Sequence, residues 1–329
     1  MTNAQVNRTG MRGFDGEFTD LPQYIRVITD RIWEGRRIGD INRYYGDPCI
    51  VETPLGVSTR VNEVIAGTEA TLKMFPDRRL LAEDIIVSGD DQHGYLSSHR
   101  IISPMTHTGG GSFGPATGKK IHARTIADCV CKDNRIVHEW LVRDHAAIAY
   151  AIGSTPNALA ARWLAERGGW SKPVASDAPD GYQSHISESE FATQYAATIE
   201  GFAGHQRVAA GVIEIYDQAV HQIAPGEAHH YGRAELNSFW QSLFAAFAVE
   251  HFTVEHLAED VSTDRGTRLA LRWRAQSKHV ASGTSGQRFG DATGRSVEIM
   301  GINHVEIADG KILREWVLID EVALWMQVL

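Results

Sequence analysis

One segment of this sequence occurs twice. Residues 114–144 and 290–320 align without a gap, at a constant offset of 176 (290 minus 114). The identical pairs include Gly114/Gly290, Thr117/Thr293, Gly118/Gly294, Glu139/Glu315, Trp140/Trp316 and Asp144/Asp320. The same offset places residues 81–84 on residues 257–260. Solenoid repeats have periods of about 20–50 residues, so this much longer period predicts a duplicated domain.

The chain length agrees with a duplication, because 329 residues is enough for two domains of ordinary size. We expect an N-terminal tail at residues 1–20 and a first domain at residues 21–152. Residues 153–186 are rich in Gly, Pro and Ser and are predicted to be a linker. The second domain is predicted at residues 187–329.

Composition excludes several classes of protein. The net charge is −9, with no cluster of Lys and Arg in the sequence, which argues against nucleic-acid binding. No apolar segment approaches the roughly 18 residues of a membrane span, and the first 20 residues have no apolar core of a signal peptide. We therefore expect a cytoplasmic protein with no membrane partner. The three cysteines, Cys49, Cys129 and Cys131, lack the spacing of a zinc site and are expected in the core.

Hydrophobic periodicity predicts helices first and strands afterwards in each copy. In the first copy, apolar residues follow helical spacing from Leu21 to Ile32, and a short strand is expected from Cys49 to Thr53. A third helix is expected before Phe75. Residues 80–88, 94–105, 121–131 and 136–142 then read as strands joined by tight turns. In the second copy the third helix has a wide apolar stripe that is expected in the core. This order predicts an α+β fold.

The local motifs resemble the SnoaL-like polyketide cyclase branch of the nuclear-transport-factor-2-like superfamily. The resemblance rests on an Arg, a His seven residues later, a glycine-rich loop, a Thr-Gly pair, a turn and a Glu-Trp strand. These are Arg100, His107, Thr117-Gly118, Arg135-Ile136 and Glu139-Trp140 in the first copy, and Arg272, His279, Thr293-Gly294, Gly310-Lys311-Ile312 and Glu315-Trp316 in the second.

The resemblance implies two tandem cone-shaped α+β barrels, each a curved antiparallel sheet wrapped around helices. Single domains of this fold commonly dimerise through the outer face of the sheet. The two copies are therefore expected to pack sheet to sheet as an intrachain pseudo-dimer, and two such chains could form a homodimer.

The sequence departs from the cyclases at one important position. They carry an acid–base Asp directly after the position of Trp140 or Trp316, where this chain has Leu141 and Val317. Asp144 and Asp320 do not obviously replace that carboxylate. Each precedes an apolar helical segment, so we expect both to be helix N-caps.

Strand parity selects candidate pocket residues. Residues 123, 125, 127 and 129, and residues 299, 301, 303 and 305, are mostly small or apolar, so this face is expected to be concave. The resemblance makes Thr125 and Asn303 pocket residues. On the last strand, parity selects Glu139 and Glu315 as general acid–base candidates. The alternative is that each pairs with Arg100 or Arg272 across the sheet as a structural contact.

Other residues complete the predicted site. Glu52, His107 and His279 are further catalytic candidates. The candidates for substrate binding are Arg100, Arg272, Thr125, Asn303, His221, His229, Trp140 and Trp316. A metal could be held by His221, His229 and Glu315, but no motif such as HExxH supports it, and exposed or core histidines are expected instead. We therefore expect neither a metal nor a cofactor, and the sequence contains no P-loop, GxSxG or dinucleotide fingerprint.

The leading hypothesis is a cofactor-independent enzyme of the cyclase, isomerase, dehydratase or lyase type. It would act on a small apolar carbonyl metabolite by general acid–base proton transfer. One alternative is a non-catalytic protein that binds a small molecule. Another is a division of labour, in which one copy reacts and the other is structural.

Overall fold

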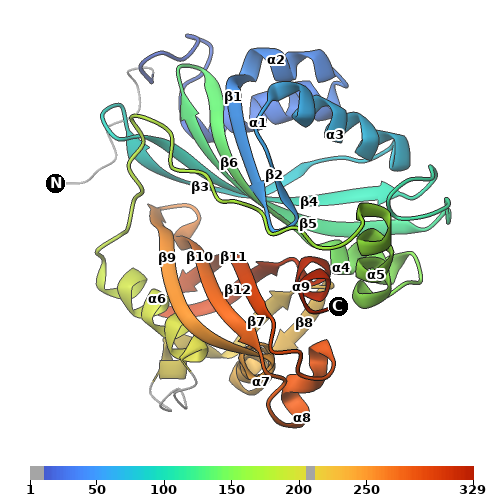
Figure 1. The fold of residues 1–329 in the computed structure, drawn as a ribbon. Helices are drawn as coiled ribbons and strands as arrows, with labels where there is room; N and C mark the ends of the chain where they lie inside the picture. Colours follow the sequence, from blue (N-terminus) through green and yellow to red (C-terminus); the bar gives the residue numbers. More distant parts are fainter. Residues whose placement is uncertain (1–10, 205–211) are drawn as a thin grey trace. The chain divides into compact units, whose positions relative to one another are not determined.

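The structure, a computed structural model, describes residues 11–204 and 212–329 and contains two compact units. The first unit comprises the chain up to Leu141 together with Lys172–Ser184. The second comprises Val142–Ser171 and His185–Leu329. Each unit contains one six-stranded sheet with helices, drawn in Figure 1. The predicted α+β fold in two tandem copies is confirmed.

The first unit begins with helices and ends with long strands. Its helices are α1 (Leu21–Thr29), a π-helical turn (Asp30–Glu34), a 3-10 turn (Ile38–Asp40), α2 (Ile41–Tyr44) and α3 (Val61–Met74). Its strands are β1 (Tyr45–Thr53), β2 (Gly56–Ser58), β3 (Leu81–Asp90), β4 (Gly94–Thr106), β5 (Lys120–Lys132) and β6 (Arg135–Arg143). Asp20 begins α1 as its N-cap, because its side chain accepts from the backbone N–H of Gln23.

The strand order in the first sheet is β2-β1-β6-β5-β4-β3. The expected hairpins are present, since β3 pairs antiparallel with β4 and β4 with β5. However, β1 pairs parallel with β6, so the sheet is mixed rather than purely antiparallel. Helices α1, α2 and α3 lie on one face of this sheet (Figure 1).

The second unit repeats this plan with the strand order β8-β7-β12-β11-β10-β9. Its strands are β7 (Tyr216–Ala224), β8 (Ala228–Tyr231), β9 (Phe247–Ser262), β10 (Gly266–His279), β11 (Ser296–Ala308) and β12 (Lys311–Ile319). Its helices include α6 (Glu190–Ala203), a 3-10 turn (Val212–Ile215), α7 (Gly232–Ala246), α8 (Gly283–Gly286), a 3-10 turn (Gln287–Phe289) and α9 (Glu321–Val328). Again one outer strand, β7, runs parallel to its neighbour β12.

Two helices that follow the first sheet along the chain belong to the second unit. They are α4 (His145–Ala151) and α5 (Pro156–Arg167), and both pack against α9. The predicted N-caps are confirmed, because the Asp144 side chain accepts from Ala147 N–H, and Asp320 accepts from the N–H groups of Val322 and Ala323. Helix α5 lies within the segment that the sequence predicted to be a linker.

Each unit has its own hydrophobic core. In the first unit the inner face of β5 contributes Ala127, Cys129 and Cys131, and all three cysteines of the chain are buried free thiols. In the second unit α7 buries Phe239, Trp240 and Phe244. No helix in the described ranges is both long and apolar enough to cross a membrane.

Candidate active site

Glu315, on β12, lies inside the second unit at the centre of a polar network. Its side chain is fully buried, at 0% exposure. The hydroxyl groups of Tyr195 and Tyr216 donate to Oε1 over 2.8 and 2.9 Å, and the amide of Gln222 donates to Oε2 over 2.7 Å. Burial raises the pKa of Glu315, although these donors lower it. Three donors therefore already bind both of its carboxyl oxygens.

The network extends on both sides of Glu315. The Asn303 amide donates to the Tyr195 hydroxyl over 2.9 Å, and the Trp273 indole donates to Asn303 Oδ1 over 3.1 Å. On the other side, His230 Nδ1 lies 2.8 Å from Gln222 Oε1. Asn303 therefore faces the interior, as parity predicted, but its amide is used in holding Tyr195.

Glu139, on β6, is the equivalent residue in the first unit. It is 7% exposed, and its Oε2 lies 3.5 Å from the hydroxyl of Tyr45, the counterpart of Tyr216. Burial and the nearby Glu139 carboxylate raise the pKa of Tyr45, so this phenol keeps its proton and acts as a donor. The positions that hold Gln222 and Asn303 in the second unit hold Val51 and Ala127 here. Glu139 therefore lies among smaller and less polar neighbours than Glu315.

The third helix also differs between the units. Phe75 lies 5.3 Å from His107, and Phe247 lies 5.5 Å from His279, between ring centroids, which aligns α3 on α7. Thr68 then takes the place of the buried Trp240. The other inward residues of α3, Val64 and Ile65, pack against the core but are only partly buried.

Helices α3 and α7 also differ in the elements that they pack against. Helix α7 packs against α6, β7 and β9, whereas the main contacts of α3 are with β1 and α2. Bulky aromatic side chains fill the second unit from the α7 side. The same place in the first unit has small side chains and a helix face that solvent reaches.

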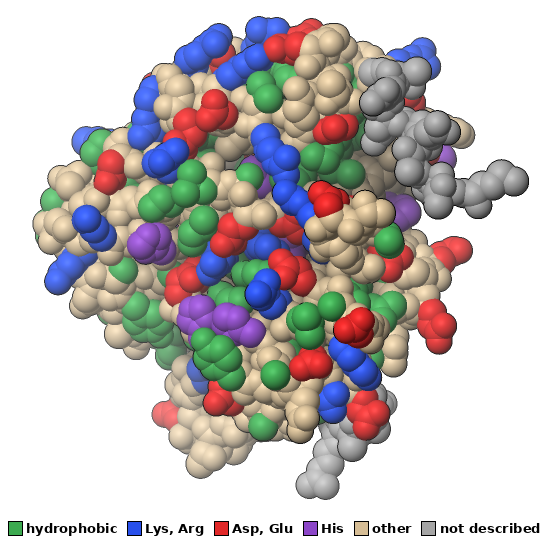
Figure 2. Space-filling model, turned by 180° about the vertical axis from the view of Figure 1, so that it is seen from behind, with side chains coloured by type: hydrophobic (Ala, Val, Ile, Leu, Met, Phe, Trp, Pro, Cys, Tyr) green, Lys and Arg blue, Asp and Glu red, His purple; other side chains and the backbone are tan. Residues whose placement is uncertain are grey.

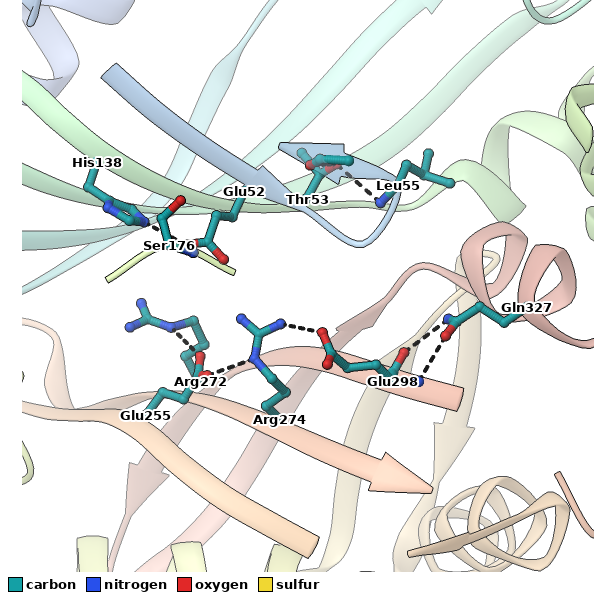
Figure 3. Close-up of polar contacts among 11 residues, drawn as sticks. Glu52, Thr53, Leu55, His138, Ser176, Glu255, Arg272, Arg274, Glu298 and Gln327 are labelled. Atoms are coloured by element: carbon teal, nitrogen blue, oxygen red, sulfur yellow. Dashed lines mark hydrogen bonds and ion pairs between the residues drawn. The ribbon is translucent and has the colours of Figure 1, made fainter. Parts of the chain in front are cut away.

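The predicted catalytic residue Glu52 lies on the opposite face of the first sheet from Glu139. Its Oε1 is 2.8 Å from His138 Nε2 and also accepts from the backbone N–H of Ser176 over 3.2 Å (Figure 3). His138 stacks on Trp140 with ring centroids 4.1 Å apart. Glu52 and Trp140 therefore belong to a buried cluster on the outer face, and neither is brought together with Glu139.

The predicted substrate-binding arginines also lie on the outer faces. Arg100 pairs with Glu83 over 3.2 Å, and Arg272 pairs with Glu255 over 3.1 Å. In the second unit this pairing continues through Arg274 to Glu298, whose backbone exchanges hydrogen bonds with the Gln327 side chain (Figure 3). The alternative that Arg100 pairs with Glu139, and Arg272 with Glu315, is wrong. The two arginines lie on the outer faces of their sheets, whereas Glu139 and Glu315 lie on the inner faces.

His107 and His279 hold equivalent loops. Both are fully buried, and in each the Nδ1 atom lies 3.1 Å from the Thr hydroxyl of the Thr-Gly pair, Thr117 or Thr293. The N–H of the following glycine donates to the carbonyl oxygen of the same histidine. This geometry gives the two histidines a role in positioning the loop.

The histidines of the β7–β8 hairpin do not join Glu315. His221 Nε2 lies 2.7 Å from His229 Nδ1, and both rings stack near Tyr231. His229 lies on the short strand β8. No group of three or more His, Cys, Asp or Glu within residues 11–204 and 212–329 has the arrangement of a metal site.

The remaining predicted residues are divided between the two faces. Thr125 is buried on the inner face and pairs with Ile101 across the sheet. Trp316 pairs with His304, which is on the other face from Asn303 and Val305. Leu141 and Val317, which occupy the position of the cyclase Asp, are both buried in the apolar cores.

The sequence reasoning missed His99, on β4. It pairs with Ala127 and Ile85, both of which belong to the inner core, so its imidazole faces the interior of the first unit. The alternation of inward and outward residues along β4, which was considered only for β5 and β6, would have identified His99. Burial and the nearby Arg26 lower the pKa of His99 to about 3, so the ring is neutral at neutral pH.

The surface charge agrees with the composition. Acidic and basic side chains are interspersed rather than separated by sign on the face drawn in Figure 2. The described side chains on that face form no continuous basic stripe of the kind that phosphate backbones require.

Comparison with known proteins assigns the family. The family model described as SnoaL-like polyketide cyclase matches residues 24–152 and 192–328. The chain belongs to this family and carries it twice. No curated protein matches the sequence.

Solved structures resemble the chain over the length of a single copy. IdmH from Streptomyces antibioticus is 18% identical, with a TM-score of 0.36, and the match covers 40% of this chain and 97% of that one. AclR from Streptomyces galilaeus is 16% identical, with a TM-score of 0.34, covering 43% and 97%. TsrD from Streptomyces laurentii is 16% identical, with a TM-score of 0.35, covering 40% and 94%.

Proposed function

We propose that the first unit is a cofactor-independent enzyme that moves a proton next to the carbonyl group of a small apolar metabolite, and that the second unit is structural. The reaction would be of the cyclase, isomerase, dehydratase or lyase type. Glu139 is the proposed general acid–base, and Tyr45 is its neighbouring donor.

One observation carries the choice of unit. Val51 and Ala127 stand in the first unit where Gln222 and Asn303 stand in the second, and the inward residues of α3 are only partly buried. Glu315, in contrast, is bound by three donors in a core that α7 fills with aromatic side chains. A carboxylate can exchange a proton with a substrate only if the substrate can approach within hydrogen-bond distance. The interior of the first unit meets this requirement better than that of the second.

The surroundings of Glu139 suit proton transfer. Tyr45, Cys49 and Cys129 lie close enough to the Glu139 carboxylate for its charge to raise their pKa values. A tyrosine hydroxyl beside it can donate a hydrogen bond to an oxygen that gains negative charge.

Exchange of hydrogen for deuterium at the α-carbon of 1-tetralone, a bicyclic ketone, tests the proposal. We expect the wild-type protein in D2O to accelerate the exchange, measured by NMR. Because general acid–base catalysis contributes about 10²–10⁴-fold, Glu139→Gln should remove about that factor. Glu315→Gln is the matched control in the other unit and should retain the rate. A Glu139→Gln protein with the wild-type rate would disprove the assignment.

A second candidate is a non-catalytic binding protein. It is favoured by Leu141 and Val317, which are buried where the cyclases carry their acid–base carboxylate. Under this alternative, wild-type protein would bind 1-tetralone but leave its α-hydrogens at the uncatalysed exchange rate.

A further inference from the structure

The inner face of β4 carries polar side chains at alternate positions. Ser97, His99 and Ser103 pair across the sheet with Cys129, Ala127 and Ala123. Antiparallel partners point to the same face of a sheet, and Ala127 and Cys129 belong to the core beneath α1. All three polar side chains therefore face the interior of the first unit.

Two of these side chains are buried without a hydrogen-bond partner among the described residues. His99 is 3% exposed and Ser103 is 1% exposed. His99 Nε2 and Ser103 Oγ make no hydrogen bond within the described part of the chain. A buried polar group left in this state costs about 1–3 kcal/mol of stability.

The second unit shows that the fold does not need polar groups at these positions. The equivalents on β10 of Ser97, His99 and Ser103 are Leu269, Leu271 and Ala275, which lie in the apolar core. The pairing supports the equivalence, because Leu271 faces Asn303 as His99 faces Ala127. The strand can therefore form with apolar residues at these positions, and its folding does not explain why His99 and Ser103 are polar.

We propose that His99 and Ser103 form a recognition subsite for the uncharged carbonyl or hydroxyl oxygens of a small cyclic ligand. This inference rests on the proposed function, because it requires a ligand inside the first unit. A neutral imidazole offers one N–H donor and one acceptor, and a serine hydroxyl offers both as well, so each suits a neutral oxygen.

The positions of the two residues limit the ligand. Ser103 lies four residues beyond His99, which separates their backbones by about 13 Å along the strand. Glu139, on β6, is two strands away from His99, or about 10 Å. A ligand that contacts more than one of these groups is expected to have at least two rings, with oxygen atoms on different edges.

The double variant His99→Leu/Ser103→Ala tests the subsite, because it introduces the residues that the second unit already carries there. The probes are 1-tetralone and tetralin, its hydrocarbon analogue without the oxygen, with binding measured by titration calorimetry. One hydrogen bond of about 1 kcal/mol corresponds to roughly fivefold in affinity, so the wild type should prefer 1-tetralone by about that factor. The double variant should reduce this preference by about the same factor.

The controls separate this inference from the proposed function. Ser277→Ala removes a buried hydroxyl from the inner face of β10 in the second unit and should leave the preference unchanged. The double variant should unfold at no lower denaturant concentration than the wild type, since it loses only polar atoms that lack partners. A double variant that keeps the preference, or a wild type that binds both probes equally, would overturn the subsite and leave the Glu139 assignment intact. A wild type that binds neither probe would overturn both.

Discussion

The Nδ1 atom of His145 lies 2.6 Å from Oδ2 of Asp320 inside the second unit. His145 is the first residue of α4, and Asp320 is the N-cap of α9. This contact therefore joins the helix that follows the first sheet to the last helix of the chain. Asp320, the last residue of the second repeated segment, thus has a structural role that goes beyond helix capping.

Replacement of Asp320 by Ala should destabilise α9. The change removes the cap, which is worth about 0.5–2 kcal/mol, and it removes the acceptor beside His145, at about 1–3 kcal/mol. Asp320→Asn keeps an oxygen that can cap the helix and should cost less. Hydrogen–deuterium exchange of the α9 amides measures the effect. Equal exchange in the Ala and Asn variants would contradict the capping role.

Asp144 should make stability depend on pH in the acidic range. Its carboxyl group accepts from the N–H groups of Ala147, Gly226 and Glu227, yet burial raises its pKa from 3.8 to about 7. The folded state then binds a proton that the unfolded state has released, so stability falls as the pH rises from about 4 to 7. The Asp144→Asn variant has no carboxyl group at this position and should lack this pH dependence.

The measurement is the free energy of unfolding in urea for both proteins at several pH values. Relative to Asp144→Asn, the wild type should lose up to about 1.4 kcal/mol per pH unit in this window. A difference between the two proteins that stays constant with pH would show that the Asp144 carboxyl group is ionised in the folded state throughout.

Much of the fold could be predicted because it depends on local periodicity. The duplication, the two N-caps and the inner face of β5 follow from spacing alone, and the structure has all three. The parallel pairing of β1 with β6 could not be read in this way, because those strands are far apart in sequence and no turn fixes their register.

The candidate site was harder to predict, because parity on one strand does not say which residues of other strands share its face. Glu52 and Glu139 are both candidates for proton transfer by residue type, yet β1 directs Glu52 to the outer face, towards His138. Both copies have an Arg at the position of Arg100 and a Glu at the position of Glu139, but these two side chains point to opposite faces of the sheet. How tightly the interior of each unit is packed depends on single residues of the third helix, such as Thr68 in the first unit and Trp240 at the equivalent position in the second.

A steric test of the filled interior is available at Gly301. A Cβ atom there would lie 2.2 Å from ring carbons of Trp273, which is fully buried. Gly301→Thr should therefore destabilise the protein by more than the 1–3 kcal/mol or so that is typical of overpacking. The first unit has Ile101 and Thr125 at the equivalent positions.

The double variant Trp273→Ile/Gly301→Thr reproduces that pair and should recover part of the stability lost in Gly301→Thr. The reason is that the smaller Ile side chain makes room for the threonine. Urea denaturation of the two single variants and the double variant gives the coupling energy. Additive effects of the two changes would contradict direct packing of residue 301 against residue 273.

Changes in the Glu315 network should destabilise the protein in proportion to the number of hydrogen bonds that they remove. Tyr216→Phe removes one hydrogen bond and should cost about 1 kcal/mol. Glu315→Gln keeps an oxygen for Tyr195 and Tyr216 and nearly the same volume, so its cost should also be small. Glu315→Ala leaves two phenol groups and the Gln222 amide without their acceptor, and it opens a cavity in a close-packed interior, so it should cost about 3–5 kcal/mol. Urea denaturation followed by tryptophan fluorescence measures the series. If Glu315→Ala were as stable as Glu315→Gln, the network would not support the second unit, and Glu315 would be available for chemistry after all.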